Sequence, residues 1–273
     1  MKKAPLYMLL ASAISLAGCY KKFDPASYAP PLRIGGYTSA SEIAPGNLVA
    51  YWSFDGSSID SVSKTTGDNK GVTFTDGIKG KCLQGASKSY MLFNPGASIL
   101  NLQKFTVTMW VKSPQNTDGI VGLIGLSNTQ SFWGNLDVFF ENGSTETTGK
   151  LKVHVSGANQ EAWLGNYDLQ NPWNSWTHIA LSYNGADTFR IYVNGARIDS
   201  KAVTGYGPAK FVNPGKMVFG TMQFQTTPSL TSATSAQPWA SYLTGNLDEV
   251  RIYNTVINDD DISSLSKLEA RGK

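Results

Sequence analysis

The chain has 273 residues and a formal net charge of +3, and Asp, Glu, Lys and Arg make up 16% of it. Two of the positive charges are Lys2 and Lys3, so the remainder carries about +1, which excludes the basic stripe that nucleic-acid binding requires. Its 27 glycines and 11% aromatic residues suit many short strands joined by tight turns in one domain.

The first residues are typical of an export signal. Lys2 and Lys3 precede an apolar stretch, residues 6–16, that is shorter than the about 20 apolar residues needed to span a bilayer. Residues 16–19 (Leu-Ala-Gly-Cys) resemble a bacterial lipobox. This resemblance implies a signal peptide over residues 1–18 and a membrane anchor made only by lipid on Cys19. A secretory signal cut elsewhere, with Cys19 incidental, is the alternative.

The next segment, residues 19–45, is predicted to be a tether. It contains four prolines among Ser, Ala and Gly and has no apolar periodicity. It would hold the folded domain, residues 46–270, away from the bilayer. The expected location is the cell envelope, lipid-anchored at the outer membrane, with the face of that membrane left open.

Alternation of apolar and polar residues predicts strands through the rest of the chain. Residues 105–112 and 150–155 each place aliphatic or aromatic side chains on one face. Comparable runs predict strands at residues 48–54, 72–75, 89–93, 136–141, 175–183, 189–193, 216–222 and 247–253. The dipeptides Asn184-Gly185 and Asn194-Gly195 are typical of hairpin turns, so residues 176–200 should form a meander.

A helical pattern occurs at the C-terminus. Asn258 is placed to cap a helix, acidic residues occupy its first turn, and Ile262, Leu265 and Leu268 fall on one face. Many strands followed by one short helix predict an all-β sandwich of two sheets.

Five segments resemble the laminin-G-like, concanavalin A-like domains. They are residues 51–56, 105–112, 176–185, 191–195 and 245–254, in family order. The resemblance covers residues 48–268 and implies a two-sheet antiparallel jelly roll with adjacent first and last strands. It implies less about activity, because this fold hosts lectins, adhesins, structural modules and glycan-cleaving enzymes. Trp110, Trp176 and His178 lie within these segments and are expected to serve packing.

The resemblance also implies a calcium site, because many relatives hold calcium where the first and last strands meet. Calcium prefers several carboxylate and carbonyl oxygens. The candidate ligands are Asp55, Asp60, Asp68, Asn69 and Asp248, with carbonyls of residues 60–71. Such an ion would be structural, so chelation should lower the melting temperature. The alternative is that these acids are solvated turn formers.

No catalytic residues are predicted, and the chain is expected not to be an enzyme. Laminarinase-like relatives place Glu, Asp and Glu at alternate positions of one concave strand. The nearest match, residues 137–141, has Asp137 and Glu141 but carries Phe139 in the middle position. No Gly-x-Ser-x-Gly nucleophile elbow occurs in the sequence.

The predicted function is glycan binding. Sugars present apolar ring faces and hydroxyl edges, so their sites combine aromatic side chains with a few polar groups. The predicted glycan-binding residues are Trp133, Asn135, Asp137, Gln160, Trp163 and Tyr167. Residues 223–239, a Thr-, Ser- and Gln-rich insertion, have a similar character. Each tryptophan alone also fits packing at the sandwich edge, and a protein-binding or structural surface module is the alternative function.

Overall fold

The structure is a computed structural model that describes residues 32–157 and 160–273. Its contacts divide the chain into two units, residues Met1–Arg33 and Ile34–Lys273. The predicted signal peptide, Cys19 and most of the predicted tether lie outside the described residues. None of the helices within residues 32–157 and 160–273 is long and apolar enough to cross a bilayer.

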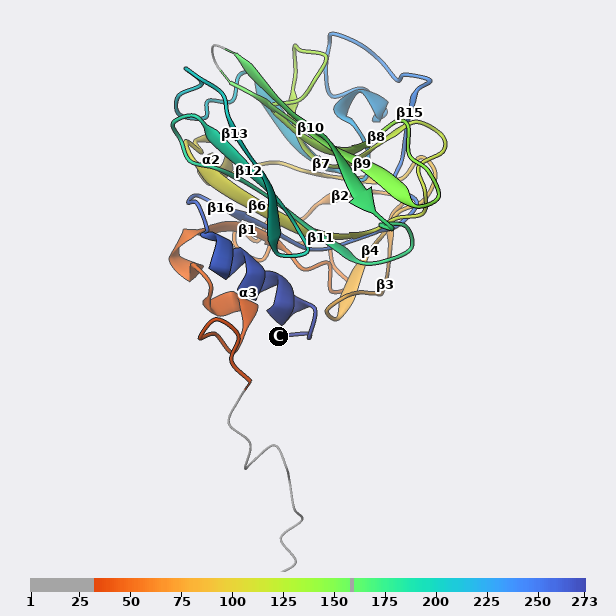
Figure 1. Cartoon of the computed structure of the whole chain (residues 1–273). Coiled ribbons are helices and arrows are strands. Elements are labelled where there is room, and N and C mark those ends of the chain that lie inside the picture. Colours follow the sequence, from red (N-terminus) through yellow and green to blue (C-terminus); the bar gives the residue numbers. More distant parts are fainter. Residues whose placement is uncertain (1–31, 158–159) are drawn as a thin grey trace, which may run out of the picture. The chain divides into compact units, whose positions relative to one another are not determined.

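Two packed sheets form the second unit (Figure 1). The first sheet contains β1 (Leu48–Trp52), β3 (Thr73–Asp76), β4 (Lys81–Gln84), β6 (Phe105–Lys112), β11 (Thr177–Tyr183), β12 (Thr188–Val193), β13 (Ala196–Ala202) and β16 (Asn246–Tyr253). The second contains β2 (Asp68–Lys70), β5 (Tyr90–Phe93), β7 (Ile120–Asn128), β8 (Leu136–Glu141), β9 (Thr148–Ser156), β10 (Glu161–Gln170), β14 (Pro214–Phe219) and β15 (Ala240–Ser241).

The strand order confirms the predicted all-β, two-sheet antiparallel jelly-roll sandwich. Sheet 1 runs β13-β12-β11-β6-β16-β4-β3 with β1 paired to β16, and sheet 2 runs β10-β9-β8-β7-β14-β5-β2. The first and last strands are adjacent as predicted, because Trp52 of β1 lies opposite Val250 of β16. β15 is the exception to the antiparallel pattern, since it runs parallel to β7.

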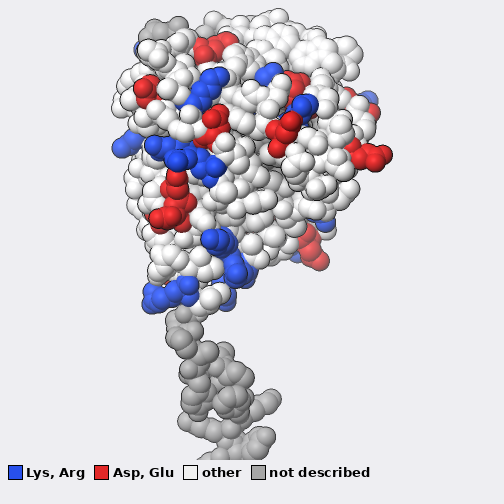
Figure 2. Space-filling view, viewed as in Figure 1, with Lys and Arg blue, Asp and Glu red and all other residues white. Residues whose placement is uncertain are grey.

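The core lies between the sheets and is rich in aromatic rings. The side chains of Trp52, Phe93 and Phe219 meet there, with ring centroids 4.9 to 5.2 Å apart. On β6, Phe105 and Val107 point into this core, as their alternation predicts. On the face drawn in Figure 2, basic and acidic side chains are interspersed rather than gathered in a stripe of one sign.

The outer face of sheet 1 is covered by α3 (Asp259–Glu269), the predicted C-terminal helix (Figure 1). Asn258 caps it as predicted, because its side chain accepts a hydrogen bond from the backbone N–H of Asp261. The buried helix residues Ile262, Leu265 and Leu268 pack with Tyr192 and Tyr253 of the sheet. A short helix, α2 (Ala97–Leu100), precedes β6.

The packed domain begins earlier than residue 46, which corrects the predicted extent of the tether. Ala40 and Ile43 are buried in the cluster formed by α3 and the outer face of sheet 1. Tyr37 donates a hydrogen bond to Asp261 at 2.9 Å. The N–H of Ala40 also donates to the carbonyl of Lys273, so the segment from Ile34 to Pro45 is part of the fold.

Candidate functional site

An aromatic cluster lies on the outer face of β8, β9 and β10. On β8, Leu136, Val138 and Phe140 point into the core, which sends Phe139 and its alternate neighbours to the outer face. The members of this aromatic cluster are Phe132, Trp133, Phe139, Trp163, Phe224 and Trp239.

The cluster contains the two tryptophans predicted from sequence and a third from the insertion. Trp133 and Trp163 meet edge to face, with ring centroids 5.0 Å apart and an interplanar angle of 85°. Trp239 stacks on Phe132 at 6.0 Å and is 37% exposed. Phe132, Trp133 and Trp163 are half-buried. The cluster therefore presents edges and faces of several rings to solvent.

Charged side chains border Trp163. The ammonium of Lys152 lies 5.3 Å from the centroid of the indole ring, a cation–π contact, and 2.9 Å from Glu141. The indole N–H of Trp163 donates to Glu161 at 3.1 Å. These contacts fix the ring orientation and place hydrogen-bonding groups beside an aromatic face.

The predicted polar residues Asn135 and Asp137 do not face solvent. The amide of Asn135 is buried and bonds the carbonyls of Ser127 and Val212. The carboxylate of Asp137 accepts from the N–H of Gly134 at 2.8 Å and lies 3.1 Å from Nδ1 of His154. Both side chains hold the loop before β8 in place.

Gln160 and Tyr167 also make contacts within the fold. Gln160 donates to the carbonyl of Thr204. Tyr167 packs against the core between the sheets and donates a hydrogen bond to Asp199 of β13. A bulge between Gly165 and Tyr167 places this ring on the face of β10 opposite Trp163. Of the six predicted residues, the structure brings the two tryptophans together at the surface.

His154 lies beneath the cluster. Its ring is fully buried, with its centroid 4.3 Å from that of Trp163. Nδ1 contacts Asp137, and Glu161 lies 3.7 Å from Nε2. The ring supports the indole from below and has no open path to solvent.

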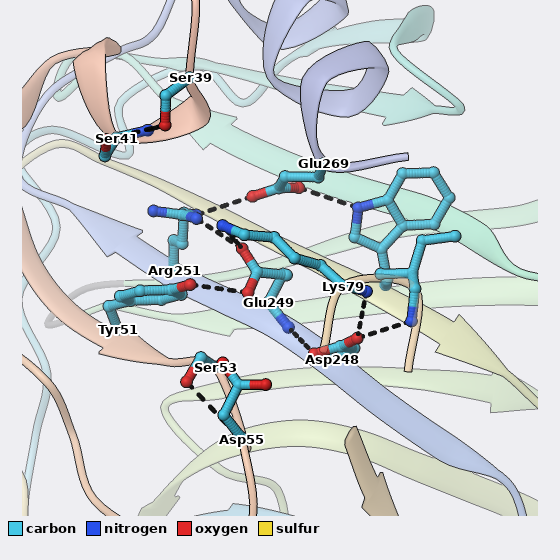
Figure 3. Close-up of polar contacts among 12 residues, drawn as sticks. Ser39, Ser41, Tyr51, Ser53, Asp55, Lys79, Asp248, Glu249, Arg251 and Glu269 are labelled. Carbon is cyan, nitrogen blue, oxygen red and sulfur yellow. Dashed lines mark hydrogen bonds and ion pairs between the residues drawn. The ribbon is translucent and has the colours of Figure 1, made fainter. Parts of the chain in front are cut away.

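Two of the predicted calcium ligands hold the hairpin that joins β3 and β4. Asp55 accepts from the N–H of Lys81 at 2.7 Å. Asp248 accepts from the N–H groups of Ile78 and Lys79 (Figure 3). A Cβ at Gly77 would overlap the Asp248 carboxylate, so glycine permits this close approach.

The other predicted ligands are engaged elsewhere. Asp60 accepts from the N–H groups of Tyr51, Val62 and Ser63. Asp68 pairs with Lys70, and Asn69 bonds the backbone of Val72. Within residues 32–157 and 160–273, no three His, Cys, Asp or Glu side chains gather as a metal site. Calcium therefore stays a prediction.

A buried charged network lies between β16 and α3 (Figure 3). Arg251 pairs with Glu249 at 2.6 Å and with Glu269 at 2.7 Å. Glu249 also accepts from the hydroxyl of Tyr51 at 2.6 Å. Glu269 accepts from the indole N–H of Trp110 at 2.8 Å.

The expected packing role of the family-segment aromatics agrees with this network. His178 is fully buried beside Trp110, at 5.2 Å between ring centroids. Burial and the nearby Arg251 charge lower the pKa of His178 to about 3, so the ring is neutral. Trp176 is half-buried. Trp110 and His178 both lie against Glu269 of α3 and help to hold that helix on the sheet.

The comparisons with known proteins agree on the fold. A family model described as the concanavalin A-like lectin/glucanases superfamily matches residues 85–263. No curated protein matches the chain.

Three solved structures illustrate the likeness. Domain 4 of AbnA, an extracellular arabinanase from Geobacillus stearothermophilus, in complex with arabinotriose, has a TM-score of 0.56 and 19% identity, covering 81% of this chain and 98% of that one. The botulinum neurotoxin serotype D ligand binding domain in complex with N-acetylneuraminic acid has a TM-score of 0.62 and 13% identity. This match covers 84% of this chain and 52% of that one. The binding domain of Paraclostridial Mosquitocidal Protein 1 has a TM-score of 0.56 and 18% identity, and the match covers 81% of this chain and 52% of that one. The chain therefore spans about half the length of the toxin binding domains.

Proposed function

Because this chain belongs to the concanavalin A-like lectin/glucanase superfamily, we propose that it is a glycan-binding module whose ligand rests on the aromatic cluster. The observation that carries the proposal is the meeting of Trp133, Trp163 and Trp239 at the surface of one sheet. Sugar rings have apolar faces that stack on aromatic rings, and a few polar groups beside such rings fix the orientation of a ligand.

The polar partners of the glycan are the charged groups at the border of the cluster. Glu161, Glu141 and Lys152 lie beside Trp163 and have hydrogen-bonding capacity toward sugar hydroxyls. We assign the contacts with sugar hydroxyls to these charged groups and not to Asn135 and Asp137, because those two side chains already form hydrogen bonds with the backbone.

The structural relatives support a carbohydrate ligand. The arabinanase domain was solved with arabinotriose and the toxin domain with N-acetylneuraminic acid. No catalytic step is proposed. The two acids on the outer face of β8 are both engaged, Asp137 with Gly134 and His154 and Glu141 with Lys152, and Phe139 separates them.

Substitution of Trp163 and Trp239 tests the proposal. Retention on a panel of polysaccharides that includes arabinan is measured by affinity gel electrophoresis for Trp163→Ala and Trp239→Ala. A stacked ring contributes about 1 kcal/mol, so each change should weaken binding several-fold while the melting temperature stays close to that of the parent.

Trp173→Phe provides the matched control. Trp173 is half-buried, packs on Phe140 at 5.3 Å and bonds the carbonyl of Thr145, away from the cluster. This variant should bind as the parent does. If the Trp163 and Trp239 variants kept their fold and bound polysaccharide as the parent does, the glycan proposal would be wrong and a protein ligand would be favoured instead.

A further inference from the structure

A second, unlike surface lies at the end of sheet 1 where β6 begins and β11 and β16 end. Two cavities of about 640 and 600 Å³ adjoin there and share Asn101, Leu102, Gln103 and Pro208. We call them together the α2 groove. Its lining comes from residues 97–104, 184–185, 205–211 and Asn254. Each cavity alone is within the size range of ligand sites, about 300 to 1,000 Å³.

The groove is fixed by the backbone. The N–H of Ala209 donates to the carbonyl of Gln103 at 2.8 Å, and the N–H of Gly207 donates to the carbonyl of Ala186 at 2.8 Å. Leu102, Tyr206 and Ala209 are buried in the core and form a rigid floor. A site that exists before its ligand arrives avoids the entropy loss of ordering it on binding.

The polar side chains of the groove are not used by the fold. In the described part of the chain, five lining side chains make no hydrogen bond or ion pair: Ser98, Asn101, Gln103, Lys104 and Lys210. Their donors and acceptors are therefore available to a ligand. Pro208 and the half-buried Phe211 add apolar area between them.

The charge of the groove has one sign. Lys104 and Lys210 belong to its lining, whereas neither cavity is lined by any described Asp or Glu. The amides of Asn101 and Gln103 precede Lys104 in one segment of the lining, and Lys210 belongs to the other segment. This arrangement differs from the aromatic cluster, where Lys152 is already neutralised by Glu141.

We propose that the α2 groove binds an acidic glycan, a segment of sugars that carry carboxylates. Lys104 and Lys210 would pair with the carboxylates, the amides would bond the hydroxyls, and Pro208 and Phe211 would contact ring faces. This site is independent of the aromatic cluster, which lies on the outer face of the other sheet.

Binding of a defined oligogalacturonide, measured by titration calorimetry, tests the proposal on the purified domain. Its fully methyl-esterified form has the same rings without the charge and should bind at least several-fold more weakly. Rising salt should weaken binding of the charged oligomer, because exposed charge pairs are screened. The double variant Lys104→Gln/Lys210→Gln should lose affinity about tenfold.

Further variants distinguish binding in the groove from a general effect of net charge and from binding at the aromatic cluster. Lys216→Gln/Lys267→Gln removes the same net charge outside the groove and should bind as the parent. Asn101→Trp fills the space shared by both cavities and should block the oligomer, whereas Trp163→Ala should not affect it. The proposal would be overturned if the esterified form bound as tightly as the charged oligomer, or if the two double variants lost affinity equally. It would also be overturned if neither oligogalacturonide nor alginate bound.

Discussion

At the scale of single residues, the main feature is the concentration of carboxylates around Arg251. Glu249 and Glu269 pair with it, and Asp248 is buried beside Glu249. Burial, with the neighbouring charge of Glu249, raises the pKa of Asp248 to about 8 despite three backbone N–H donors. Burial also raises the pKa of Glu269. The folded state therefore binds a proton on Asp248 and on Glu269 more tightly than the unfolded state does.

This shift makes stability depend on pH in a defined direction. The pKa of Asp248 is higher in the folded state than its unfolded value of about 3.9, so the folded state binds the proton more tightly. The contribution is complete below about pH 4 and is lost as the pH rises toward 8. Between about pH 5 and pH 8 we expect the free energy of unfolding to fall by at least about 1 kcal/mol, measured by urea denaturation.

Asp248→Asn supplies the control, because its amide keeps an oxygen acceptor but does not titrate. Its pH dependence should be smaller than that of the parent, with the remainder due to Glu269. The same dependence in both proteins would show that Asp248 titrates in its ordinary range.

Residue roles were the part of the site that sequence reasoning predicted least well. Trp133 and Trp163 were expected at a surface and meet there. Asn135 and Asp137 have side chains that suit a sugar equally well, yet they bond the backbone of loops close in space. Backbone partners such as Val212 lie far along the chain from Asn135, so the sequence alone could not show whether these side chains bind a sugar or a backbone group. Trp239 was noted only as part of an insertion.

At the scale of elements, alternation predicted strands whose two faces differ. Residues 105–112 and 136–141 coincide with β6 and β8. β7 was missed because all of its residues are buried, so its sequence has no polar face. β10 is also absent from the predicted strands, because its bulge interrupts the alternation. The segment from Ile34 to Ile43 lacked periodicity because its few apolar residues pack on α3, distant in sequence.

The cap of α3 gives a prediction for this element. Asn258→Ala removes the side chain that accepts from the N–H of Asp261 and should lower the free energy of unfolding by about 1 kcal/mol. The urea midpoint measures it. Asn258→Ser keeps an acceptor and should stay near the parent value, whereas equal losses in both variants would assign the effect to packing instead of capping.

At the scale of the whole molecule, we propose that the domain is held to the outer membrane by lipid on Cys19. The proposal rests on the lipobox-like residues 16–19 and the apolar residues 6–16. Cys19→Ser should move the protein from the membrane fraction to the soluble fraction after ultracentrifugation and abolish labelling with radioactive palmitate. If this variant remained in the membrane fraction, lipid on Cys19 would not be what holds the protein to the membrane.

The position of β16 also governs when the domain can assemble. β16 is the last strand among the described residues, yet it lies inside sheet 1 between β6 and β4 and also pairs with β1. A chain emerging from the ribosome, or crossing a translocation channel from its N-terminus, has a gap in that sheet until residues 246–253 arrive. Because such long-range pairings form late, the nascent domain should remain unfolded and dependent on chaperones until residues 246–253 have been synthesised.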